Sequence, residues 1–192
     1  MSIAAALGAY KATAADKDVR FSPAPAASYP AHQTNAQVTV AADPFDTEEK
    51  VKTAFGKNNP NPFGVLPMLV VIQNDSGKAI RAEQMKLEYI GSDRSRVAAT
   101  PAADVRYLKG PRRPNVMAGP TGVPKVLKRK NPLDSWEIEG RAFAAKMIPP
   151  GQSASGFFYF EAKFHPGSRL YLTGLSEADT GKELFYYEIP FE

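Results

Sequence analysis

The chain has 192 residues, of which 43% are hydrophobic and 23% charged, a composition typical of an ordinary globular protein with one substantial core. It has no cysteine, so disulfides, thiolate metal sites, cysteine nucleophiles and a lipid-modified N-terminal cysteine are excluded. The formal net charge is +4, and no apolar run reaches the roughly 18 residues that a membrane-spanning helix needs.

Residues 1–36 are predicted to be a signal-peptide remnant or an extended flexible arm. Ala12 and Ala14 have the A-x-A spacing of a signal-peptide cleavage region. The preceding apolar stretch is short and no basic region comes before it, so an alanine-rich lead stays open as the alternative. From 16 to 35 the sequence is rich in Pro, Ala and Ser, which is typical of a linker.

The first elements of a domain are predicted after this arm, which places the domain at 37–192. Residues 37–43 are rich in β-formers and predict a strand. A short helix follows between 46 and 56, because Asp46 or Thr47 can cap its start and Gly56 can end it.

Two apolar runs come next. Residues 66–72 are almost continuously apolar, which predicts a strand buried on both faces. Residues 84–90 alternate between apolar and polar, which predicts a strand with one wet face. Because the polar turn 73–80 separates the runs, the sequence predicts that they form a central hairpin.

The second half of the chain begins with a basic, proline-rich loop predicted at 106–130. A helical insertion is predicted at 131–148, with Gly140 as its weak point. Three more strands are expected from the aromatic-rich runs 156–164, 169–175 and 183–191. Six or seven short strands with frequent turns favour a mainly β, antiparallel sandwich with two short helical insertions.

Four stretches carry a resemblance to a known group: "DPFDTEEKVKTAFG", "FGVLPMLVVIQNDSGKAI", "PPGQSASGFFYF" and "TGKELFYYEIPF". Over residues 37–192 the chain resembles uncharacterised bacterial envelope proteins that carry an immunoglobulin-like or fibronectin-like β-sandwich. The resemblance implies an Ig-like fold and a periplasmic or envelope location, and implies no reaction. Peripheral attachment to the membrane stays open. A cytoplasmic location stays open as the alternative.

No catalytic, metal or cofactor site is predicted. The two histidines, His32 and His165, lie in distant segments, whereas a histidine metal site needs two or three ligands close together. Ser153 and Ser155 lie in a G-x-S-x-G-like stretch, but a nucleophile elbow needs a strand before it and a helix after it. The acidic stretch 43–49 could hold calcium, although helix capping explains the same residues.

The sharper signal is charge. Residues 106–130 carry eight cationic side chains and no acid, while in the rest of the chain 16 basic residues face 20 acidic ones. Such asymmetry favours encounter with anionic partners. The candidate partner-binding residues are Arg112, Arg113, Lys125, Lys128, Arg129 and Lys130.

The sequence therefore predicts a non-enzymatic binding or scaffolding protein, an accessory subunit of a larger envelope or membrane-associated complex. An acidic protein surface is the favoured partner, anionic lipid is the second candidate, nucleic acid is disfavoured, and no small-molecule substrate is expected. Outward-facing aromatics of the last three strands could add to the interface. The alternatives are a hydrolase that uses dispersed carboxylates and a purely structural sandwich.

Overall fold

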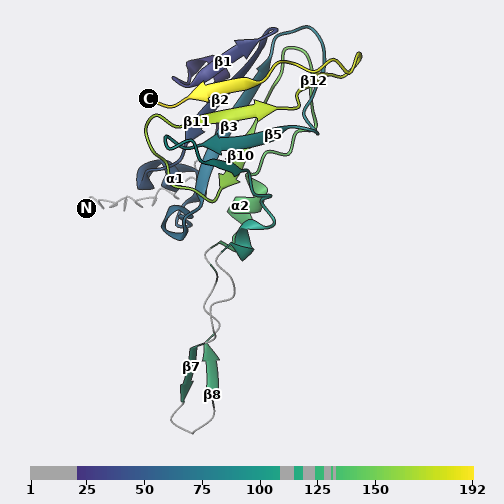
Figure 1. The fold of residues 1–192 in the computed structure, drawn as a ribbon. Helices are drawn as coiled ribbons and strands as arrows, with labels where there is room; N and C mark the ends of the chain where they lie inside the picture. Colours follow the sequence, from purple (N-terminus) through teal and green to yellow (C-terminus); the bar gives the residue numbers. More distant parts are fainter. Residues whose placement is uncertain (1–20, 109–114, 119–123, 128–130, 132) are drawn as a thin grey trace, which may run out of the picture.

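A computed structural model describes residues 21–108, 115–118, 124–127, 131 and 133–192 (Figure 1). The first sheet has the strand order β1-β2-β3-β10 and contains β1 (His32–Asn35), β2 (Val38–Pro44), β3 (Leu66–Asn74) and β10 (Ser153–Phe160). The second sheet has the order β13-β11-β5-β6 and contains β5 (Lys86–Ile90), β6 (Arg96–Ala98), β11 (Arg169–Thr173) and β13 (Tyr187–Pro190). All neighbouring strands in both sheets are antiparallel.

The remaining elements are small. A three-stranded sheet has the order β12-β4-β9 and is made of β4 (Ile80–Arg81), β9 (Met147–Ile148) and β12 (Ser176–Glu177). A separate hairpin joins β7 (Asn115–Ala118) and β8 (Pro124–Leu127). The helices are α1 (Glu48–Phe55), α2 (Trp136–Gly140) and the 3-10 turns η1 (Ala26–Ser28), η2 (Asn61–Phe63) and η3 (Val105–Tyr107). The prediction of a mainly β, antiparallel fold with two short helices is confirmed.

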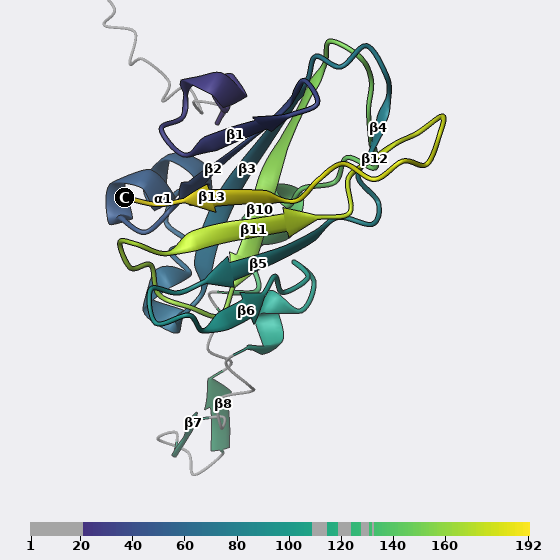
Figure 2. The same ribbon diagram turned by 45° about the horizontal axis from the view of Figure 1, so that its top comes forward.

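The strand β3 is the centre of the fold and is buried on both faces, as its apolar run predicts. On one face, Met68 and Val70 lie in a core shared with the second sheet. On the other face, Leu69 and Val71 lie in a second core, to which α1, η1 and α2 also contribute. The first sheet is therefore a middle layer, with the second sheet on one side and the helices on the other (Figure 2).

The predicted hairpin of the two apolar runs is wrong. The strand β3 pairs with β2 and β10 in the first sheet, whereas β5 pairs with β11 and β6 in the second. The connection between them crosses from one layer to the other. It turns at Asn74, whose buried side chain donates to the carbonyls of Lys78 (2.7 Å) and Ile148 (2.9 Å) and accepts from the amide and hydroxyl of Ser76.

The segment predicted to be a linker or arm is ordered structure from Phe21 onward. Ala26 is fully buried in η1, and β1 forms the outer strand of the first sheet. The strand escapes prediction because its residues, HQTN, are all polar and show no apolar alternation. The turn to β2 holds Ala36 (φ +47°) and Gln37 (φ +59°) in the left-handed region, where glycine or asparagine is usual.

The predicted helical insertion at 131–148 is also wrong in extent, since of its described residues only Trp136–Gly140 is helical. The chain then runs beside β10, where the amide of Phe143 donates to the carbonyl of Phe157 (3.1 Å). This approach is possible because β10 has Gly156 there. A Cβ at Gly156 would lie 2.5 Å from the Phe143 nitrogen and 2.9 Å from the Ala142 carbonyl carbon.

The helix predicted between 46 and 56 is confirmed as α1. Thr47 caps it, with its hydroxyl accepting from the amide of Lys50 (3.3 Å). Gly56 follows with φ +60°. Glu48 and Glu49 lie in the first turn, where carboxylates interact favourably with the helix dipole.

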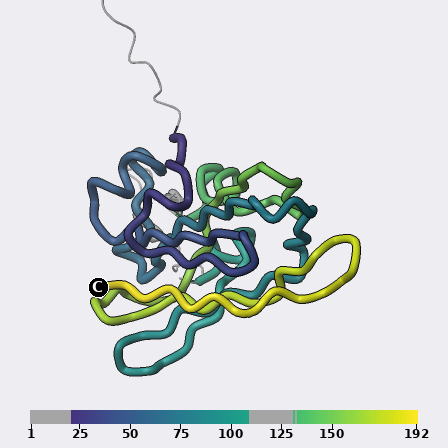
Figure 3. Tube along the Cα trace, turned by 90° about the horizontal axis from the view of Figure 1, so that it is seen from above, coloured from purple at the N-terminus to yellow at the C-terminus, as the bar shows by residue number. Residues whose placement is uncertain are grey.

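The two sheets meet along the strands β1 and β13, which lie side by side in Figures 2 and 3. Side chains of β1 supply the junction, because the amide of Glu188 donates to the Gln33 side chain (2.7 Å) and Asn35 donates to the carbonyl of Tyr186 (3.0 Å). The hydroxyl of Tyr187 lies 3.3 Å from two carbonyls at this corner. The outer strands of two different sheets thus protect each other's edges.

Among the described residues, no helix is long and apolar enough to cross a membrane.

Candidate functional site

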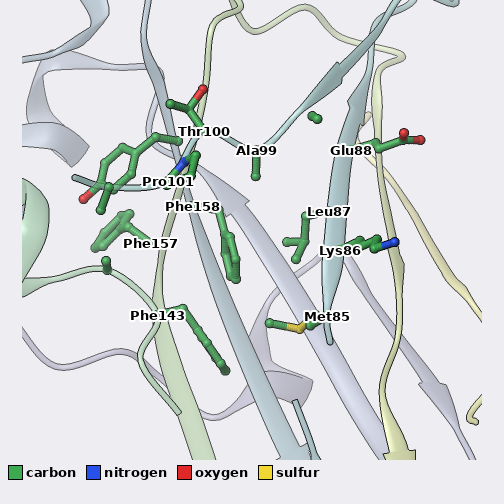
Figure 4. A pocket seen from close by; sticks show the side chains of 14 residues that line it. Met85, Lys86, Leu87, Glu88, Ala99, Thr100, Pro101, Phe143, Phe157 and Phe158 are labelled. Atoms are coloured by element: carbon green, nitrogen blue, oxygen red, sulfur yellow. The ribbon is translucent and has the colours of Figure 1, made fainter. Parts of the chain in front are cut away.

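An apolar slot opens on the side of the molecule opposite the β1–β13 corner, where the two sheets separate. Its volume is about 390 Å³. In Figure 4, the rings of Phe143 and Phe158 form one wall, and Met85 and Leu87 face them from the other. Lys86 and Glu88 alternate with these residues along the chain and point away from the slot.

The walls of the slot are built by four stretches of the chain: 85–88, 98–102, 142–143 and 157–159. Phe158 comes from β10, and Phe143 stacks on it with ring centroids 5.5 Å apart. The chain after β6 closes one end, since the amide of Thr100 donates to the carbonyl of Tyr159 (2.7 Å) and so links the second sheet to the first. Ala99, one residue earlier, leaves space in the slot because its side chain is small.

Two polar groups near the slot, the Tyr159 hydroxyl and the Glu88 carboxylate, are already engaged. The hydroxyl of Tyr159 donates to the carbonyl of Ile138 (2.7 Å), and burial raises the pKa of this hydroxyl above its usual value, while the nearby Arg141 opposes the shift. On the outer face, Glu88 forms an ion pair with Arg96 (2.9 Å). The slot can therefore receive an apolar group, and it presents no pair of free carboxylates for acid–base chemistry.

The basic segment 106–130 is described only in part. Arg106 follows directly on the body and forms ion pairs with Asp134 (3.1 Å) and Glu139. Of the predicted partner-binding residues, Lys125 lies in β8, and the others lie outside the described residues: Arg112, Arg113, Lys128, Arg129 and Lys130. Within the predicted basic, proline-rich loop, β7 and β8 pair as an antiparallel hairpin (Figure 1).

The other sequence candidates lie apart from one another. His32 is in β1, with its Nδ1 2.6 Å from the carbonyl of Tyr29, and His165 lies in the turn before β11. Ser153 and Ser155 are in β10, not in a nucleophile elbow. Within the described part of the chain, no three His, Cys, Asp or Glu side chains gather in a way that could hold a metal ion.

The acidic stretch 43–49 serves local structure. Asp43 forms an ion pair with Lys50 (2.7 Å), whose ammonium also donates to the carbonyl of Pro44 (3.1 Å). The capping role expected for this stretch is confirmed at Thr47.

The C-terminal aromatics divide between core and surface. Phe157, Tyr159, Phe160, Tyr187 and Phe191 are buried. Before β13, by contrast, the side chains of two successive aromatics are exposed, Phe185 by 82% and Tyr186 by 50%.

The sequence does not predict the slot. The alternation over 84–90 predicts that Met85 and Leu87 share the buried side of a strand, but the predicted helical insertion 131–148 includes Phe143. Nothing local in the sequence indicates that 141–143 lies against β10, because the residue that permits the close approach, Gly156, is distant in the chain.

No protein-family model matches the chain, and no curated protein matches it. Among solved structures, the crystal structure of a functionally unknown protein from Listeria monocytogenes EGD-e is similar over 84% of this chain and 81% of that chain. The sequence identity is 12% and the TM-score is 0.34. A likeness of this extent assigns no function, and the resemblance to envelope proteins stays a prediction.

Proposed function

We propose that this protein is a non-enzymatic binding protein that docks on an acidic protein surface through its basic segment 106–130. It would act as an accessory or scaffolding subunit of a larger assembly at the bacterial envelope, with an Ig-like β-sandwich as its body. The resemblance of residues 37–192 to envelope proteins supports the location and the finer fold class. Two packed antiparallel sheets are consistent with that class.

The observation that carries the proposal is the separation of charge along the chain. Eight cations and no acid lie within 106–130, whereas the remainder has a net charge of −4 from 16 basic and 20 acidic residues. Arg106 is neutralised by Asp134 and Glu139 at the body, so seven cations are left in the segment beyond it. A cluster of one sign raises the association rate with a surface of the opposite sign, and salt screens the effect.

The test compares two variants with the same change in net charge. In the first, Arg112, Arg113, Lys128 and Arg129 are replaced by glutamine. In the matched control, four exposed lysines of the body are replaced by glutamine, namely Lys52, Lys57, Lys163 and Lys182. Each protein is used to capture partners from the membrane fraction at about 50 mM and about 500 mM salt, where the screening length falls severalfold.

The wild type and the body control are expected to capture the same acidic protein at low salt, and the first variant about tenfold less. The melting temperatures should agree to within a few degrees, because surface charges contribute little to stability. Equal capture by the first variant and the wild type would refute the proposal. Sedimentation with phosphatidylglycerol vesicles supplies the second arm: binding to vesicles without protein capture would replace the acidic protein by anionic lipid.

A further inference from the structure

The strand β6 has an open edge beside the apolar slot. In antiparallel pairs, the backbone groups of alternate residues point toward the neighbouring strand. The amide of Gly91 donates to Ser95 and the amide of Ala99 donates to Leu87, so residues 95, 97 and 99 face β5. The N–H and C=O groups of Arg96 and Ala98 therefore point away from the sheet.

No described group covers that edge. β6 ends the strand order of the second sheet, and both Arg96 and Ala98 are exposed. Among the described residues, no hydrogen bond from outside the sheet reaches the backbone of either residue. The β1–β13 corner is different, because there side chains satisfy the edge. The fold thus protects one side of the second sheet and leaves the other open to pairing.

The slot lies directly inward of this edge. Ala99 borders the slot and follows β6, while Phe143 and Phe158 form the far wall (Figure 4). A strand added beside β6 would extend the second sheet past its present edge, with alternate side chains turned toward the first sheet. One such side chain would enter the slot, where apolar surface on both sides would remove it from water.

Charge around the edge indicates what the added strand carries. Glu88 is paired with Arg96 (2.9 Å), which offsets its charge. Lys86 and Arg94 are exposed at either end of this region, and neither forms an ion pair with any residue that the structure describes. Asp93, next to Arg94, is exposed as well, so three cations (Lys86, Arg94 and Arg96) face two carboxylates (Glu88 and Asp93). The rim keeps a small excess of positive charge, which carboxylates beside the apolar residue of a peptide would complement.

We propose that β6 accepts an extended acidic peptide segment as an added strand, with one large apolar side chain of that segment in the slot between Phe143 and Leu87. Backbone hydrogen bonds to Arg96 and Ala98 supply affinity, and the slot supplies specificity. This inference rests on the proposed function and names the part of the acidic partner that is recognised.

Two substitutions test the two halves of the site in the full-length protein. Ala98→Pro removes an outward N–H that no strand of the sheet uses, and Ala99→Phe fills the slot. Ala103→Phe, at an exposed position four residues further along the chain, is the matched control. The probe is a random nonapeptide library displayed on phage, selected on the wild type at low salt, with the enriched sequences synthesised and labelled for fluorescence anisotropy.

Enriched peptides are expected to combine one large apolar residue with flanking Asp or Glu. Their dissociation constants should rise at least about tenfold for Ala98→Pro and for Ala99→Phe, and stay unchanged for Ala103→Phe. On binding, hydrogen exchange should slow at the amides of Arg96 and Ala98. If Ala99→Phe fails to fold, two other measurements test the site. They are the affinity of Ala98→Pro and the affinity of the wild type for a peptide N-methylated on alternate amides, which cannot donate to β6 and should bind more weakly.

The inference is overturned if no peptide is enriched, or if enriched peptides bind the wild type and Ala98→Pro equally. Capture of the natural partner by the two kinds of variant distinguishes a failure of this inference from a failure of the proposed function. Capture that depends on the basic segment and not on Ala98→Pro overturns the strand site and leaves the proposed function standing. Capture that ignores the basic segment overturns the proposed function, whatever the peptides do.

Discussion

Replacing Gly156 with alanine is expected to destabilise the protein through a steric effect on a neighbouring segment. The added methyl group would lie 2.5 Å from the Phe143 nitrogen and 2.9 Å from the Ala142 carbonyl carbon, and both are backbone atoms that no rotamer change can move. Residues 141–143 must therefore move off β10. Two hydrogen bonds are then lost, from Phe143 to the Phe157 carbonyl (3.1 Å) and from Phe157 to the Arg141 carbonyl (2.9 Å).

Each of these bonds contributes about 1 kcal/mol, and the weakened packing of Phe143 on Phe158 adds about 1 kcal/mol more. The expected loss is therefore about 3 kcal/mol, or a fall in Tm of about 6–12 °C for a chain of this size. Urea and thermal unfolding followed by far-UV circular dichroism measure it.

Gly181→Ala is the control for the backbone effect of replacing a glycine. Gly181 has φ +70° and open space where a Cβ would go. The substitution should therefore lower the free energy of unfolding by about 1 kcal/mol, from the left-handed backbone alone. If Gly156→Ala lost no more stability than Gly181→Ala, the close approach of 141–143 to β10 would be refuted. The same variant should also weaken binding at the slot, because Phe143 forms one of its walls.

Three further results are expected. Asn74→Ala should cost about 2–4 kcal/mol in urea unfolding, because its buried amide joins two carbonyls and a turn, and a loss below about 1 kcal/mol would contradict this role. Gln37→Gly should raise the unfolding free energy by about 0.5–1 kcal/mol by relieving a left-handed residue (φ +59°), whereas an unchanged or lower Tm would count against strain in this turn. Burial raises the pKa of Tyr159 and of Tyr187, so the unfolded state loses these protons first and stability should fall as the pH rises above the ordinary tyrosine pKa of about 10. Absorbance at 295 nm should show these tyrosines ionising only with unfolding, and Tyr159→Phe with Tyr187→Phe should flatten the decline.

The parts of the fold that were predictable from sequence are those with a local cause. The helix α1 has its cap at Thr47 and its stop at Gly56 within ten residues. The continuous apolar run of β3 predicts its burial on both faces. The failures have non-local causes. β1 is polar throughout and is a strand only because β2 pairs with it. Residues 141–143 leave the helical pattern because β10 offers them an edge, and Met147–Ile148 because it pairs with β4.

The candidate site follows the same division. The charge excess of 106–130 is a property of composition, so it can be counted from the sequence. The slot and the open edge of β6 depend on which strands become neighbours. The two apolar runs predict a hairpin, and if β3 lay beside β5 neither feature would exist.

The β1–β13 corner has a consequence for how the molecule is made. The hydrogen bond from Glu188 to Gln33 spans 155 residues, so the corner cannot form until nearly the whole described chain has left the ribosome. At 5–20 residues per second, synthesis of that span takes roughly 8–30 s. For that time the β1 edge of the first hairpin lacks the strand that covers it in the finished protein.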